Sequence, residues 1–141
     1  MIVISIVAFI LAWIWGGHTE RFVVAVQLLL WLAFGSFRWM VGDVYIDSMI
    51  EDSLALTVFG WLTFRRDRWW LFVATAALAL TVLVHVLTIV TDISWDAAVS
   101  ARVGLGLVTY VALLAGVGER WLAGERPAGD AAIWRRRRPA S

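Results

Sequence analysis

The stretch WWLFVATAALALTVLVHVLTIV, residues 69–90, decides the fold because it contains no Asp, Glu, Lys or Arg. As a helix it is long enough to cross a hydrocarbon core about 30 Å thick. A helix on the surface of a soluble protein would need a polar face, and this one has none. Residues 97–118 are similar apart from Arg102, residues 22–41 are similar apart from Arg38, and residues 1–15 carry no charge.

These runs predict an all-α integral membrane protein, a compact bundle of five transmembrane helices. The apolar fraction of 62% supports this class, because soluble chains contain about 45–50%. We expect the spans at about residues 1–15, 22–41, 44–64, 69–90 and 97–118. Residues 1–123 would form the bundle, and residues 124–141 a basic, mostly flexible cytoplasmic tail.

Residues 44–64 are the weakest of the five predicted spans. Their uncharged part, after Asp52, is shorter than the ~20 residues expected of a span. The alternative is a protein with four spans, in which residues 42–64 lie on the membrane surface as an amphipathic helix.

Arginine orients the chain, because short cytoplasmic loops are rich in positive charge. All twelve basic residues are arginine, and most of them lie in RRDR (65–68) or between residue 119 and the C-terminus. Both segments are therefore expected in the cytoplasm. This predicts a multi-pass protein of the bacterial inner (plasma) membrane, with the N-terminus outside and the C-terminus inside. The N-terminal run reads as a retained span, since it lacks a basic region and a cleavage site.

Acids recur at helical spacing where the third span begins. Asp43, Asp47 and Glu51 follow one another every fourth residue and so share one helix face. Charges this deep in a membrane should face partners or water. We therefore expect these acids to face an outward-opening polar pocket. Its other members would be Arg38, His85 and Arg102, with Glu51 beside His85 and one arginine.

A simpler interpretation stays open for the same residues. The first two acids would lie among the lipid headgroups, and the two arginines would extend outward to the interface. Only Glu51 would then lie deep enough to need a partner.

The composition excludes several kinds of chemistry. Without cysteine there are no disulfides, thiolate metal sites or cysteine nucleophiles. The GxSxG, HExxH, Walker and GxGxxG patterns are absent from the sequence. We therefore predict no enzyme, no metal and no cofactor; haem ligation by His85 is the one cofactor hypothesis that the sequence permits.

Three classes of function remain. The first is a non-enzymatic accessory or interaction subunit of a membrane complex. The second is a small oligomeric transporter or channel that handles cations or protons through Asp47, Glu51 and His85. The third is a cofactor-binding or sensory membrane protein. The expected partners are the lipid bilayer, anionic lipid at the tail segment Arg135–Arg138, and a protein partner or a second copy of the chain; nucleic acid is not expected.

Overall fold

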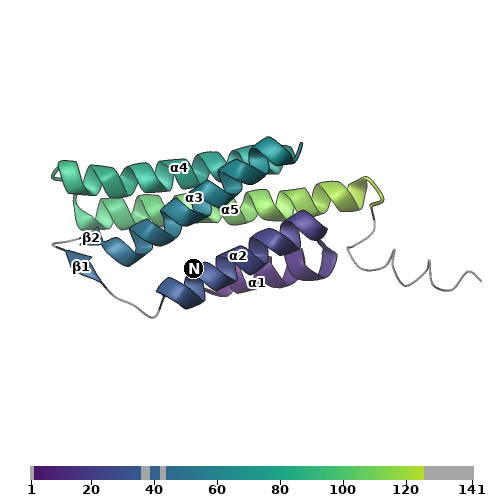
Figure 1. The fold of residues 1–141 in the computed structure, drawn as a ribbon, viewed down its shortest axis with the longest axis horizontal. Helices are drawn as coiled ribbons and strands as arrows, with labels where there is room; N and C mark the ends of the chain where they lie inside the picture. Colours follow the sequence, from purple (N-terminus) through teal and green to yellow (C-terminus); the bar gives the residue numbers. More distant parts are fainter. Residues whose placement is uncertain (1, 36–38, 42–43, 126–141) are drawn as a thin grey trace, which may run out of the picture.

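The computed structural model describes residues 2–35, 39–41 and 44–125, which form five helices and one short antiparallel ribbon (Figure 1). The helices are α1 (Ile2–Trp15), α2 (His18–Phe34), α3 (Ile46–Arg65), α4 (Trp69–Val90) and α5 (Trp95–Leu122). The ribbon pairs β1 (Met40–Val41) with β2 (Val44–Tyr45) between α2 and α3. The predicted helical bundle is thus confirmed for the part of the chain that is described.

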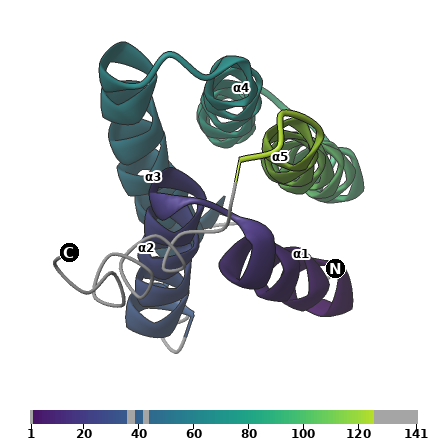
Figure 2. The ribbon, with the colours of Figure 1, turned by 90° about the vertical axis from the view of Figure 1, so that its right-hand side faces the viewer.

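The helices form a closed ring in sequence order. Each helix packs on the next one along the chain, and α5 closes the ring by packing on α1. Figure 2, which views the bundle along the helices, shows this circular order. The α1–α2 turn, the α3–α4 loop and the C-terminus of α5 meet at one end, which we call the arginine end. The ribbon and the α4–α5 connection lie at the other, the ribbon end (Figure 1).

The predicted boundaries hold for α4 and need correction for α2. α4 covers residues 69–90, as predicted, and α5 extends the predicted segment at both ends. α2 begins earlier than residue 22 and ends at Phe34, well before residue 41. It begins early because the Glu20 carboxylate accepts a hydrogen bond from the Gly17 backbone N–H at 2.9 Å, which caps the first turn. Residues 40–41 and 44–45, both predicted to be helical, belong to the ribbon instead.

Two helices, α4 and α5, are long and apolar enough to cross a membrane, and α1 is a shorter apolar helix. Within the most apolar window of each, only 28% of α4 and 22% of α5 is buried inside the chain. Large apolar side chains therefore cover the outside of the bundle. Examples are Val3, Leu29, Phe72 and Val111, all more than half exposed.

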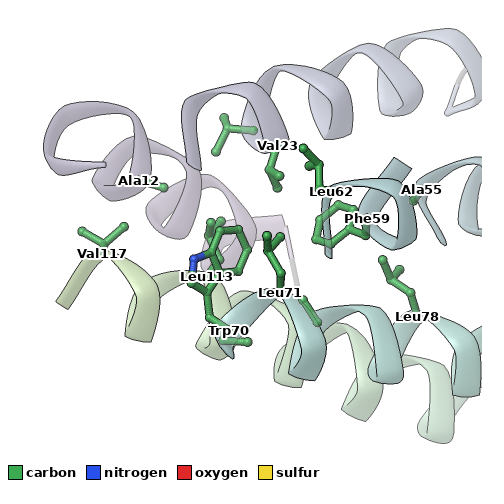
Figure 3. Close-up of a cluster of buried hydrophobic side chains, with 13 residues drawn as sticks. Ala12, Val23, Ala55, Phe59, Leu62, Trp70, Leu71, Leu78, Leu113 and Val117 are labelled. Carbon is green, nitrogen blue, oxygen red and sulfur yellow. The ribbon is translucent and has the colours of Figure 1, made fainter. Parts of the chain in front are cut away.

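The packed core lies toward the arginine end. Its largest side chain is Trp70, at the start of α4, which is completely buried. Phe59 and Leu62 from α3, Leu71 from α4 and Val117 from α5 belong to the same cluster (Figure 3). Residues from all five helices thus meet at this end of the ring.

Gly116 makes room for Trp70. A Cβ atom at this position of α5 would collide with the indole ring of Trp70. The rest of the core encloses the indole of Trp70, so the side chain cannot easily move away. Gly104, on the same helix, has open space where its Cβ would be.

We expect Gly116→Ala to lower the free energy of unfolding by about 1–3 kcal/mol, the usual cost of overpacking a core. Gly104→Ala is the matched control. It should be neutral or stabilising by up to about 1 kcal/mol, because alanine favours helix more than glycine does. Thermal unfolding of the purified proteins in detergent, followed by tryptophan fluorescence, measures both. Equal effects at the two glycines would contradict the close Trp70–Gly116 packing.

Candidate functional site

A chain of hydrogen bonds joins three helices in the ribbon half of the bundle. The Nε2 atom of His85, on α4, lies 2.9 Å from Oδ2 of Asp52, on α3. Its Nδ1 atom lies 3.4 Å from Nη1 of Arg102, on α5. A guanidinium can only donate, so Nδ1 accepts and the ring proton is on Nε2, which donates to Asp52. The order of donation is therefore Arg102 to His85 to Asp52.

The three side chains lie below the ribbon end and not at the surface. At 1.5 Å per residue, each is about 8–10 Å from the terminus of its helix at that end. His85 is 1% exposed, and the Asp52 side chain is 28% exposed. The imidazole is thus enclosed, while the carboxylate keeps access to the interior space of the ring.

Glu51 lines three neighbouring cavities. One of about 130 Å³ also contacts Asp52 and Arg102, and one of about 90 Å³ lies between α1, α2 and α5 beside Tyr110. The third, of about 290 Å³, is bordered by Gly35 near the ribbon end. Among the residues that the structure describes, the Glu51 carboxylate makes no hydrogen bond or ion pair. Among the acids inside the ring, Glu51 is therefore the one that lines the most open space.

The other predicted site residues are only partly placed. Asp47 lines the 290 Å³ cavity with Glu51, and its buried Oδ1 atom has no hydrogen-bond partner among the described residues. Arg38 and Asp43 lie outside the described residues. His85 and Arg102 are brought together, as predicted.

The predicted partner of His85 needs correction, because the structure pairs it with Asp52 and not with Glu51. Counting every fourth residue put Glu51 on the face of Asp47 and left its neighbour Asp52 aside. Consecutive helix residues lie about 100° apart, however, and α3 packs on both α2 and α4. The face that carries Asp52 meets α4, and the face that carries Glu51 meets the cavities. The adjacent pair Glu51 and Asp52 was the sequence signal: two consecutive acids in one helix cannot both face the same neighbouring helix.

The geometry also bears on cofactors. Both ring nitrogens of His85 are already in contact with Asp52 and Arg102, so ligation of haem iron would have to break one of these contacts. In the described part of the chain, no group of three His, Asp or Glu side chains could hold a metal ion. The carboxylates that line open space together are those of Asp47 and Glu51.

A second polar cluster, not predicted from the sequence, ties the arginine end together. Glu20 is completely buried; besides capping Gly17, it lies 3.9 Å from Nη1 of Arg120. Arg120 Nη1 and Arg68 Nη2 each lie 3.2 Å from Oε2 of Glu125. Glu125 was predicted to be part of a flexible tail, yet it bridges α5 and the α3–α4 loop. Residues 126–141, including Arg135–Arg138, lie outside the described residues.

Comparison with known proteins does not assign this arrangement to a family: no protein-family model matches the sequence, and no match was found among curated proteins or solved structures. The function must therefore be argued from the site.

We predict that Asp52→Asn destabilises the protein more than Glu51→Gln does. The first change removes the charge that His85 donates to, and a hydrogen bond to a charged group contributes about 1.5–3 kcal/mol. The second removes a carboxylate with no described partner and should change the free energy of unfolding by less than about 1 kcal/mol.

Arg102→Gln should partly rescue Asp52→Asn, because the double change leaves no lone charge at the end of the hydrogen-bond chain. A double-mutant cycle, measured by thermal unfolding in detergent, gives the coupling. Purely additive effects would show that the three side chains do not act together.

Proposed function

We propose that this chain is a multi-pass membrane protein, a non-enzymatic subunit that binds a proton or a small monovalent cation at Glu51 from the ribbon end. The observation that carries the proposal is the position of the Glu51 carboxylate. It lines three neighbouring cavities inside the ring and has no hydrogen bond or ion pair among the described residues.

The apolar exterior supports the membrane assignment. A core helix of a soluble protein would be mostly buried, whereas α4 and α5 expose most of their apolar length. Exposed apolar surface of this extent requires lipid or protein to cover it.

The course of α3 supports five spans over four. α3 packs along α2 and α4 and buries Ala55, Phe59 and Leu62. It runs from the ribbon end to the arginine end, beside α4 (Figure 1). An amphipathic helix on the membrane surface would instead lie across one end of the bundle. At about 1.5 Å per residue its 20 residues reach ~30 Å, enough to cross the bilayer.

The charges support an orientation with the arginine end in the cytoplasm. Four arginines gather there: Arg65, Arg66, Arg68 and Arg120. The α4–α5 connection at the ribbon end carries Asp92 and no arginine. Positive charge favours the cytoplasmic side. The cavities around Glu51 would then open toward the outside of the cell.

The charge balance of the site favours a cation over an anion. Arg102 is linked to Asp52 through His85, which leaves Asp47 and Glu51 without a cationic partner in the described part of the chain. A carboxylate in a poorly hydrated environment is stabilised by a proton or a cation. An anion would be repelled by both acids.

The packed core supports a binding role over a free-standing pore. Phe59, Leu62, Trp70 and Leu71 fill the ring between the Glu51 cavities and the arginine end. A transporter or channel would have to separate this cluster in each cycle. A subunit that binds on one side and passes the effect to a partner protein, or to a second copy, needs no such opening.

Membrane insertion can be tested with single cysteines, because the chain has none of its own. We expect Ile93→Cys, in the α4–α5 connection, to react with a membrane-impermeant maleimide on intact cells. Asp67→Cys, in the α3–α4 loop, should react only after the inner membrane is permeabilised. The reverse pattern would invert the orientation, and equal labelling of the two in a soluble fraction would refute the membrane assignment.

Cation binding can be tested with a hydrophobic carbodiimide, which modifies protonated carboxyl groups inside membranes. We expect Glu51 to be the main labelled residue in mass spectra and labelling to slow as Na⁺ or pH is raised. Glu51→Gln should remove most of the label. Asp96→Asn, in the exposed first turn of α5, is the matched control and should leave the labelling unchanged. Labelling that survives Glu51→Gln and ignores both Na⁺ and pH would contradict the proposal.

A further inference from the structure

A further cavity, of about 430 Å³, lies at the arginine end between α2 and α3. His18, Thr19 and Phe22 from the first turns of α2 form one wall. Trp61, Leu62 and Arg65 at the end of α3, and Arg66 directly after it, form the other. It is separate from the Glu51 cavities, because it shares no lining residue with any of them.

The two arginines of this cavity differ from the other arginines at the same end. Arg68 and Arg120 are paired with Glu125, and Arg120 also lies near Glu20. Arg65 and Arg66 are both exposed, and neither forms an ion pair within the described residues. The Arg65 guanidinium instead lies over the Trp61 ring, 5.2 Å from its centroid, which holds its charge beside the cavity.

The rest of the cavity wall is apolar. Phe22 and Trp61 are about half exposed, at 47% and 52%, and Leu62 is nearly buried. The cavity thus combines two unpaired guanidinium groups with an aromatic and aliphatic surface. A small soluble anion would use only the first of these features, whereas a lipid would use both.

We propose that this cavity binds the phosphate headgroup of an anionic phospholipid, with Arg65 and Arg66 on the phosphate and Phe22 and Trp61 against the first part of the acyl chains. The inference rests on the proposed membrane insertion, which puts the arginine end at the cytoplasmic surface. Basic pockets between helices at the cytoplasmic surface of a membrane are suited to anionic lipid headgroups. The site is distinct from the predicted lipid contact of Arg135–Arg138.

The test is a titration of the full chain, purified in detergent, with short-chain phosphatidylglycerol or with phosphatidylcholine of the same chain length. Bound lipid is counted by native mass spectrometry, and the rise in melting temperature reports occupancy. We expect one phosphatidylglycerol to bind saturably and in preference to phosphatidylcholine. Since each arginine near an anionic lipid contributes roughly a factor of five in affinity, Arg65→Gln/Arg66→Gln should weaken binding about 30-fold.

Two further variants sharpen the test. Arg135→Gln/Arg136→Gln removes the same net charge from the tail and should leave the saturable site intact. Arg65→Lys/Arg66→Lys keeps both charges and should retain most of the preference for phosphatidylglycerol. Loss of binding in the tail variant, but not in Arg65→Gln/Arg66→Gln, would overturn the assignment to this cavity. Equal binding of the two lipids would overturn the headgroup proposal.

Glycerol phosphate distinguishes a lipid from a soluble phosphate ester. We expect it not to displace phosphatidylglycerol at equal concentration, because it lacks the apolar part. Displacement at equal concentration would show that the cavity takes a soluble phosphate and would overturn the lipid assignment. The titration in detergent does not depend on topology, so its failure is distinguishable from a failure of membrane insertion in the cysteine experiment.

Discussion

The hydrogen-bond chain from Arg102 through His85 to Asp52 is the interaction on which the ribbon half of the bundle depends. It joins α5, α4 and α3, in a region where the apolar core has ended. An isolated charge placed there would cost several kcal/mol to bury. Joining the charges through a neutral imidazole lets a cation and an anion stay apart and still satisfy each other, and it fixes the rotation of α3 against α4.

The rotation of α3 against α4 determines the direction in which the Glu51 side chain faces. Because Asp52 must face His85, its neighbour is turned about 100° away, toward the cavity between α1, α2 and α5. The same contact that stabilises one acid therefore leaves the other without a protein partner among the described residues. An unpaired carboxylate and a paired carboxylate at adjacent positions of α3 follow directly from helical geometry.

The sequence predicts the bundle well where one property dominates. Both ends of α4 follow from the sequence, because no charged residue, glycine or proline interrupts its apolar run. The end of α2 does not follow from the sequence, because Phe34 and Gly35 are no more polar than the helix before them. Hydropathy also does not indicate that β1 pairs with β2. The residues of the site could be predicted as a group, but the choice of Asp52 over Glu51 could not. It depends on which neighbour each face of α3 meets, and spacing along one helix carries no information on that.

Charged residues are arranged differently at the two ends of the ring, so the two ends are chemically distinct. At the arginine end, Glu20 and Glu125 neutralise Arg120 and Arg68 and link α2, the C-terminus of α5 and the α3–α4 loop. Toward the ribbon end, the described acids outnumber their cationic partners and line open space. A ligand that binds among these acids changes the charge only where the packing is loose, since Trp70 and its neighbours keep the other end rigid. Any movement that follows binding should therefore concentrate in the ribbon half, in the outer turns of α2 and α3.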